Sequence, residues 1–317
     1  MKKIAFIGGD ARQLTAASVL RASGYDTVLY GFSLKAEEPA ASVVDSLCCS
    51  SSDEVPRELA EGIRTAGRLA ASAEDALADC EAVILPLPAS HDGVHVSMPL
   101  AGGIRLSCEQ LLAAMDAAGV RMLCGGKLSE RVQEACRERG IEVFDYYGQE
   151  DFAIANAVPT AEGAIAIAMR ELPITLHGAD ALVIGCGRIG KVLARKLHAL
   201  STHVTVSARK PSDHAWIRAD GMEPAVTGQL CELLAKRHFD VIFNTVPHRV
   251  LGEAELAGIP AGGLIIDLAS KPGGVDIAEA EKRTQNVIWA LSLPGKVAPV
   301  TSGRIIAGTL LSRLNGG

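Results

Sequence analysis

The stretch ALVIGCGRIGKVLARKL, residues 181–197, decides the fold of the second half of the chain. An apolar run ends at Gly185, and Gly187 and Gly190 complete the pattern G-x-G-x-x-G before a helical pattern begins. In this setting the first glycine makes a tight turn, the second lets the backbone approach a pyrophosphate, and the third lets the helix pack on the sheet. The motif predicts a Rossmann domain, with a glycine-rich turn that binds nothing as the alternative. We expect the cofactor phosphates at Gly185, Gly187, Arg188, Ile189 and Gly190.

The next strand of this half, HVTVSA (203–208), ends where the choice of cofactor is expected to be made. An NAD site places Asp or Glu about 20 residues after the glycines, where it binds the ribose 2′-hydroxyl. Here the chain has Ser207, Arg209 and Lys210 instead. Two cations beside a hydroxyl suit a 2′-phosphate, so we predict NADP rather than NAD. A solvated basic turn is the alternative.

A third stretch, DVIFNTV (240–246), occupies the fourth-strand position of this half. In doubly wound folds the carboxyl end of that strand lies beside the nicotinamide half of the cofactor. We therefore expect cofactor contacts from Asn244, Thr245, Val246 and Pro247. His248 follows directly and is a candidate general base, because histidine titrates near neutral pH. A histidine of a surface loop is the alternative.

Short apolar runs alternate with helical patterns along the chain, which predicts an α/β protein with two doubly wound parallel-sheet lobes. We assign residues 1–150 and 297–317 to a substrate-side domain, with the C-terminal helix packing back on it. Residues 151–296 form the Rossmann NADP-binding domain, and a linking helix is expected at 159–172, between two prolines. The segment 31–56 is poorly patterned. Strands are expected in the first half at KIAFI (3–7), DTVLY (26–30), AVILPL (82–87), VRMLC (120–124) and IEVFDY (141–146), and helices at 11–22, 109–118 and 128–139.

Composition excludes several classes of protein. The 317 residues are 48% hydrophobic with a net charge of −6, which argues against a nucleic-acid binder. No apolar run approaches the roughly 18 residues of a membrane span, and MKKIAFIGGD is interpreted as a first strand rather than a signal peptide. The eight scattered cysteines form no C-x-x-C pattern, so we expect reduced thiols in a cytoplasmic protein and no metal.

Five further stretches go beyond generic α/β rules. They are GGDARQ (8–13), ILPLP (84–88), NAVPTAEGAI (156–165), IDLASKPGGVD (266–276) and LPGKVAPVTSG (293–303). With the NADP-type fingerprint, they resemble the A subunit of dipicolinate synthase from endospore-forming bacteria over the whole chain except 31–56. The stretch SMPLAGGIRLS (97–107) has no counterpart that we can place.

The resemblance implies an NADP-dependent oxidoreductase of sporulation, in the cytoplasm of the mother cell. Its product would be dipicolinate, pyridine-2,6-dicarboxylate, made from 4-hydroxy-tetrahydrodipicolinate, an intermediate of the lysine pathway, or from the dihydrodipicolinate that it forms by losing water. A flavoprotein-like B subunit would be the partner, and a homo-oligomer is possible. Two rival interpretations are an enzyme like alanine dehydrogenase or the 2-hydroxyacid dehydrogenases that acts on another small acid, and a regulatory subunit that binds NADP without catalysis.

The proposed chemistry sets requirements for the site. A ring dicarboxylate needs two cationic anchors, and loss of hydride requires an acceptor for a proton. Arg12, Lys271 and Lys296 are the candidate anchors, expected in loops that face the crevice between the lobes, and Lys296 or His248 is the candidate proton acceptor. Glu162 is equally explained as a helix-dipole partner and Asn156 as a backbone cap. The predicted substrate-binding set is Gly9, Asp10, Arg12, Gln13, Asn156, Thr160, Glu162 and Lys271.

Overall fold

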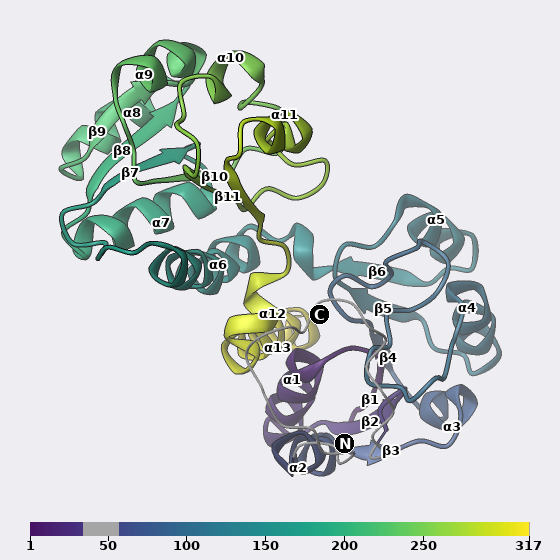
Figure 1. Cartoon of the computed structure of the whole chain (residues 1–317). Helices are drawn as coiled ribbons and strands as arrows, with labels where there is room; N and C mark the ends of the chain where they lie inside the picture. Colours follow the sequence, from purple (N-terminus) through teal and green to yellow (C-terminus); the bar gives the residue numbers. More distant parts are fainter. Residues whose placement is uncertain (34–56, 317) are drawn as a thin grey trace. The chain divides into compact units, whose positions relative to one another are not determined.

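The computed structural model describes residues 1–33 and 57–316, which divide into two compact units (Figure 1). Unit 1 comprises Met1–Ala153 and Pro299–Gly317, and unit 2 comprises Ile154–Ala298. Each unit contains a six-stranded parallel sheet with helices on both faces, so the predicted α/β class with two doubly wound sheets is confirmed. Most of the poorly patterned segment 31–56, including Cys48 and Cys49, lies outside the described residues.

The sheet of unit 1 has the order β3-β2-β1-β4-β5-β6. Successive side chains of β1 point to opposite faces, as in every strand, and both faces are covered. Ile4 and Phe6 pack with α1, α2 and α13, whereas Ala5 and Ile7 pack with α3, α4 and α5. The strands are β1 (Lys3–Ile7), β2 (Asp26–Tyr30), β3 (Arg68–Leu69), β4 (Ala82–Ile84), β5 (Met122–Gly125) and β6 (Glu142–Asp145); the helices are α1 (Ala11–Ala22), α2 (Arg57–Ala66), α3 (Ala73–Leu77), α4 (Cys108–Ala117), α5 (Glu130–Glu138) and α13 (Pro299–Asn315), with a 3₁₀ turn at Tyr146–Gly148.

The sheet of unit 2 has the order β12-β11-β10-β7-β8-β9. When its strands are numbered from β7, this is the same strand order as in the sheet of unit 1. The direction of winding reverses between β7 and β10, which pair in register through Ala181 and Val241. Helices α6, α7 and α8 cover one face, and α9, α10 and α11 cover the other. The elements are α6 (Glu150–Glu171), β7 (Asp180–Ile184), α7 (Arg188–Ala199), β8 (His203–Ala208), α8 (Pro211–Ala219), β9 (Glu223–Val226), a 3₁₀ turn (Thr227–Gln229), α9 (Leu230–Lys236), β10 (Val241–Asn244), α10 (Glu253–Leu256), β11 (Leu264–Asp267), α11 (Ile277–Lys282), β12 (Asn286–Trp289) and α12 (Leu293–Val297).

Three differences from the predicted elements have local causes. The edge strands β3 and β9 were not predicted, because neither contains a buried apolar run, and Pro224 in β9 is tolerated at an edge. The predicted strand 82–87 stops at Ile84, since Pro86 has no amide hydrogen to donate to a neighbouring strand.

Helix α6 begins at Glu150, nine residues before the predicted start of the linking helix at Pro159. The proline lies inside the helix, where it has no amide hydrogen to donate to the preceding turn. The helix is long and apolar enough to cross a membrane, but 56% of its apolar window is buried. Ala161, Ala164 and Ala168 lie in the core of unit 2, so α6 is a core helix.

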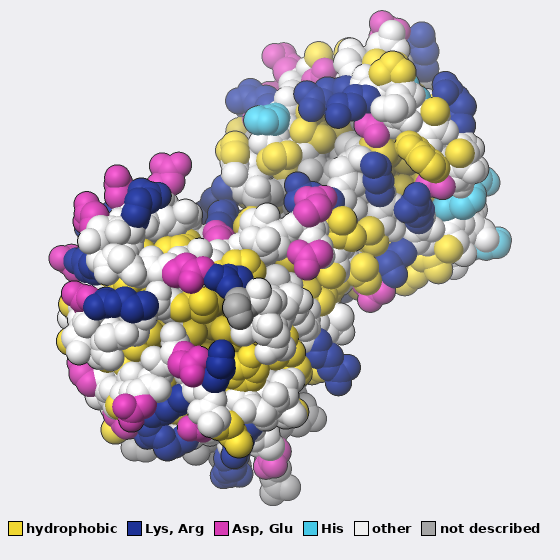
Figure 2. Space-filling model, turned by 180° about the vertical axis from the view of Figure 1, so that it is seen from behind, with side chains coloured by type: hydrophobic (Ala, Val, Ile, Leu, Met, Phe, Trp, Pro, Cys, Tyr) yellow, Lys and Arg dark blue, Asp and Glu magenta, His cyan; other side chains and the backbone are white. Residues whose placement is uncertain are grey.

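The surface carries charges of both signs. On unit 1 in Figure 2, Lys and Arg side chains are interspersed with Asp and Glu side chains. The described residues of this face therefore form no continuous basic stripe of the kind that binds a nucleic-acid backbone.

Helix α13 returns to unit 1 and packs along α1. At Gly303 a Cβ atom would lie 2.5 Å from both the Arg12 carbonyl oxygen and the Thr15 Cβ atom, so the two helices touch backbone to backbone. At Gly308, on the same helix, a Cβ atom would meet nothing within 4 Å. Gly303 is therefore tightly packed, whereas a side chain at Gly308 would have open space around it.

We expect Gly303→Ala to lower the free energy of unfolding by about 1–3 kcal/mol, because the added methyl group separates α13 from α1. Gly308→Ala is the matched control and should raise it by about 0.5–1 kcal/mol through helix propensity. Urea unfolding followed by circular dichroism measures both. Equal effects of the two substitutions would contradict the packing.

Candidate functional site

The three glycines that follow β7 each occupy a distinct environment. Gly185 has φ +102°, and a Cβ atom there would lie 2.5 Å from Thr245 Oγ1. At Gly190 a Cβ atom would collide with the Gly185 carbonyl oxygen, so α7 packs tightly on the loop. At Gly187 a Cβ atom would meet nothing within 4 Å, and no side chain caps this end of α7 among the described residues. The open position is the one that a pyrophosphate must approach, so the loop fits a dinucleotide.

The end of β8 carries cations and no acid. Arg209 and Lys210 are exposed at the start of α8. Ser207 is fully buried, and its hydroxyl accepts a hydrogen bond from Thr227 Oγ1 at 3.3 Å. Ser207 therefore has a partner inside the protein, and of the three predicted residues only Arg209 and Lys210 present their side chains to solvent.

Asn244 closes β10 and is engaged within the protein rather than exposed to a ligand. Its Nδ2 donates to Asp267 Oδ1 at 2.8 Å and to the Val246 carbonyl oxygen at 3.0 Å. The buried Asp267 carboxylate also accepts from the amides of Ala269 and Gly274, at 3.0 and 2.8 Å. These bonds connect the ends of β10 and β11 with the loop that contains Lys271.

Asp267 was not among the predicted site residues. The sequence feature that could have identified it is the stretch IDLASKPGG, in which this polar residue follows a buried run at the end of a strand. Thr245 donates to the Ile184 carbonyl oxygen at 2.9 Å and supports the turn at Gly185. Pro247 and His248 are exposed, whereas Val246 is half-buried.

The glycine amides of the first loop are bonded within the protein. Gly9, which the sequence predicts as a substrate-binding residue, donates its amide hydrogen to the Ser97 carbonyl oxygen at 3.0 Å. The Gly8 amide donates to Tyr30 at 2.8 Å, and a Cβ atom at Gly8 would lie 2.7 Å from Met98 Cγ. The segment SMPLAGG, which the sequence left unplaced, thus covers this loop and fills the space at Gly8, whereas Gln13 and Pro86 fill the space at Gly9.

Arg12 is buried and paired with Asp10. Its Nε lies 3.0 Å from Asp10 Oδ1 and its Nη2 lies 2.7 Å from Asp10 Oδ2. Nη2 also donates to the Leu87 carbonyl oxygen at 2.5 Å, so Arg12 links the first loop to the loop after β4. Among the described residues, only Nη1 of this guanidinium lacks a hydrogen-bond acceptor. Nη1 of Arg12 can therefore still donate a hydrogen bond to the carboxylate of a ligand.

Gln13 is hydrogen-bonded to the loop after β4, which Arg12 also contacts. Its Nε2 donates to the Leu85 carbonyl oxygen at 3.0 Å and to Tyr146 Oη at 3.3 Å. Tyr146 is fully buried and donates to the same carbonyl oxygen at 2.9 Å. Burial raises the pKa of the Tyr146 phenol, so it stays protonated. Gln13 thus holds the β4 loop in place.

The remaining predicted residues lie in unit 2. Thr160 is buried and donates to the Asn156 carbonyl oxygen at 2.8 Å, a local bond within α6. Glu162 is exposed and pairs with Lys196 at 2.8 Å. Lys271 and Lys296 are both exposed, the first after β11 and the second in α12. A ligand can therefore reach Lys271 and Lys296 without breaking a contact of either side chain with the described residues.

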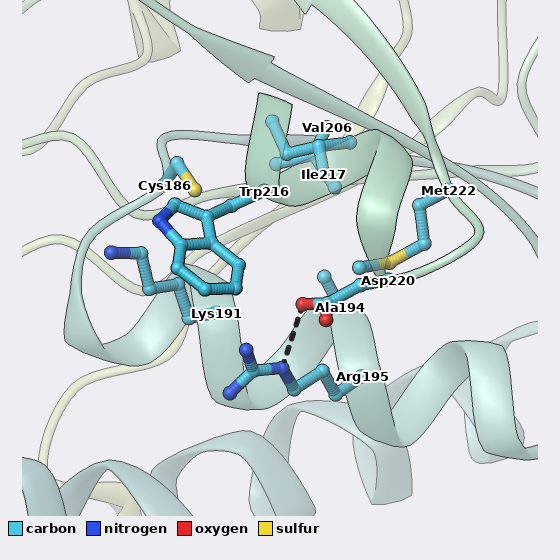
Figure 3. Close-up of a pocket in the computed structure, with 9 residues that line it drawn as sticks. All are labelled: Cys186, Lys191, Ala194, Arg195, Val206, Trp216, Ile217, Asp220 and Met222. Carbon is cyan, nitrogen blue, oxygen red and sulfur yellow. Dashed lines mark hydrogen bonds and ion pairs between the residues drawn. The ribbon is translucent and has the colours of Figure 1, made fainter. Parts of the chain in front are cut away.

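A pocket of about 280 Å³ lies between α7 and α8 (Figure 3). Figure 3 shows Trp216 and Lys191 at one end, and Arg195 joined to Asp220 by an ion pair of 2.9 Å. Of its lining residues only Cys186 belongs to the glycine loop. The pocket lies on a helical face of the sheet and adjoins the cofactor loop at Cys186.

The described cysteines are free thiols. Burial raises the pKa of Cys80 and Cys136 to about 11 and that of Cys124 to about 12, so these thiols stay protonated near neutral pH. Within residues 1–33 and 57–316, no group of three or more His, Cys, Asp or Glu side chains could hold a metal ion.

A glycine loop of this geometry, at the switch point of a parallel sheet, defines a Rossmann-type, dehydrogenase-like protein that binds NAD(P). Residues 160–272 match the family model described as D-isomer specific 2-hydroxyacid dehydrogenase, NAD binding domain. The chain is 30% identical to the A subunit of dipicolinate synthase from Bacillus subtilis (strain 168) over 309 residues, or 97% of this chain and 94% of that protein. The chain belongs to the family of dipicolinate synthase A subunits, which confirms the resemblance of its motifs.

Solved structures agree with this assignment. The crystal structure of the dipicolinate synthase A subunit from Bacillus halodurans matches with a TM-score of 0.81 and 30% identity, covering 99% of this chain and 97% of that one. A transhydrogenase from Sinorhizobium meliloti matches with a TM-score of 0.67 and 15% identity, covering 99% and 93%. The second likeness shows the fold alone.

The three glycine environments predict different outcomes for substitution. Gly187→Ala should change the free energy of unfolding by less than about 1 kcal/mol, yet weaken dinucleotide binding by about tenfold or more, because the methyl group lies where the pyrophosphate approaches. Gly190→Ala should instead destabilise the protein by about 1–3 kcal/mol through its clash with Gly185. Thermal unfolding and fluorescence titration with the reduced cofactor separate the two effects. Undiminished binding by Gly187→Ala would contradict the site.

Proposed function

We propose that this protein is the NADP-dependent oxidoreductase that forms dipicolinate. Its membership of the family of dipicolinate synthase A subunits, together with the open glycine loop of unit 2, supports this proposal. The balanced reaction is loss of water from 4-hydroxy-tetrahydrodipicolinate, followed by loss of one hydride and one proton from dihydrodipicolinate to give the aromatic pyridine. NADP supplies the hydride acceptor when it is bound.

The choice of NADP rests on the charge at the end of β8. Arg209 and Lys210 are exposed there, and no carboxylate stands at residues 207–210 to bind a 2′-hydroxyl. A guanidinium forms paired, charge-assisted hydrogen bonds with a phosphate, so these residues favour the phosphorylated cofactor.

We expect Arg209→Ala to raise the Michaelis constant for NADP by about tenfold or more and to leave that for NAD nearly unchanged, because the lost hydrogen bonds go to the 2′-phosphate. Arg218→Ala, which removes an exposed arginine at the far end of α8, is the matched control. Initial rates with each cofactor measure the effect. A wild-type preference for NAD, or equal losses with both cofactors, would contradict the assignment.

The substrate contacts are proposed by residue. Arg12 binds a carboxylate through Nη1, while Asp10 fixes the direction of the guanidinium and Gln13 holds the loop beneath it. In unit 2, Lys271 is the proposed substrate contact, and Lys296 or His248 accepts the proton; all three side chains are exposed. Asn156, Thr160 and Glu162 on α6, together with Gly9 of the first loop, are the remaining proposed substrate-binding residues.

The cellular setting follows from the family. Membership among A subunits implies a B subunit as partner, proposed to be flavoprotein-like, and we propose that the protein acts in the cytoplasm of the mother cell during sporulation. The activity assay described next also tests two other functions, which are reduction of another small oxo acid and binding of NADP without catalysis.

Purified protein with freshly generated 4-hydroxy-tetrahydrodipicolinate and NADP should form pyridine dicarboxylate, which is measured by its ultraviolet absorbance. The reaction is run with and without the B subunit, and with pyruvate and reduced cofactor as the rival assay. The Gly187→Ala protein controls for cofactor-independent product. Absence of product in both arms, with cofactor binding intact, would favour the regulatory role over catalysis.

A further inference from the structure

The loops after β1, β4 and β5 of unit 1 interlock at the carboxyl edge of the sheet. Arg12 donates to the Leu87 carbonyl oxygen from the β1 side. From the β5 side, the Gly126 amide donates to the Pro86 carbonyl oxygen at 3.1 Å, and its own carbonyl oxygen accepts from the Ala89 amide at 2.8 Å. The β4 loop is therefore fixed between Arg12 and Gly126, and the residue after Gly126 is Lys127.

The backbone of Lys127 is constrained, whereas its side chain has no bonded partner among the described residues. Its φ of +58° lies in the left-handed region, which is unfavourable for a lysine. Asp145, at the end of β6, holds this conformation by accepting from the amides of Lys127 and Leu128, at 3.0 and 2.9 Å. The side chain is exposed, and its ammonium forms no ion pair or hydrogen bond with the described residues. Strained, well-supported positions of this kind occur most often at functional sites.

The cationic side chains of Arg12 and His95 at this edge are both paired with carboxylates of the protein. Asp10 largely neutralises Arg12, and His95 on the β4 loop is paired with Asp92 at 2.8 Å. A ligand with two carboxylates therefore needs a second positive group besides Arg12. Neighbouring strands are about 4.8 Å apart, so β1 and β5, with β4 between them, stand about 10 Å apart. Arg12 and Lys127 thus follow strands about 10 Å apart at one edge of the sheet, a spacing that a small ring with two carboxylates can span.

We propose that Lys127 binds the second carboxylate of the dicarboxylate ligand whose first carboxylate lies at Arg12. This inference rests on the proposed function, and it adds a residue that sequence reasoning did not select. Its consequence is selectivity: Lys127 makes the site prefer a pyridine dicarboxylate to a monocarboxylate.

Direct binding tests this inference without turnover. The full chain, saturated with NADP, is titrated with pyridine-2,6-dicarboxylate and with pyridine-2-carboxylate, and the ratio of the two dissociation constants is the readout. In Lys127→Met this ratio should fall by about tenfold or more, because one charge-assisted hydrogen bond is lost for the dicarboxylate only. Lys127→Arg should retain the preference, and Lys2→Met, the same charge change at the amino end of the sheet, should leave it unaltered.

Lys127→Gly separates binding from folding. Glycine adopts the positive φ without penalty, so the thermal unfolding midpoint should not fall, yet the preference should disappear. A wild-type preference that survives in both Lys127→Met and Lys127→Gly would overturn the role of Lys127 while leaving the proposed function intact. Wild-type protein that binds neither acid would overturn both.

Discussion

The two-sided burial of both parallel sheets is the constraint on which the rest of the structure depends. Because helices cover each face, the strand interiors are mostly apolar. Polar groups gather at the carboxyl edges, where the strands give way to loops. Arg12, Lys127, Asn244 and Asp267 all stand within a few residues of such an edge.

The two glycine loops, after β1 and β7, show how one local shape serves different purposes. Both follow the first strand of a sheet and precede its first helix. In unit 2 the space above Gly187 is open, so a ligand can use it. In unit 1 the equivalent position at the start of α1 is Asp10, whose carboxylate accepts from the Arg12 amide, and the amides of Gly8 and Gly9 are bonded within the protein. The first loop therefore presents the side chains of Asp10 and Arg12 where the second loop presents open backbone.

Local sequence patterns predicted most of the fold and part of the candidate site. Helix 11–22 and strands such as 203–208 were predicted to the residue, because their apolar periodicity and flanking turns agree with their burial. The edge strands β3 and β9 have no such signal. The contacts of Asn244 with Asp267, and of Gly9 with Ser97, join residues more than twenty positions apart. No local pattern specifies such pairings, so the link that Asn244 forms between two strand ends could not be predicted, and its role as a cofactor contact stays a prediction.

The return of α13 to unit 1 has a consequence for biosynthesis. Unit 2 is one uninterrupted segment, but unit 1 is closed by residues that follow unit 2 in the chain. Ile306, Ala307 and Leu310 are fully buried there, so α1 stays uncovered until all of unit 2 has been synthesised. Domains fold as units while the chain emerges. Unit 2 can thus fold as soon as it emerges from the ribosome, whereas unit 1 must wait for α13, which is made after unit 2.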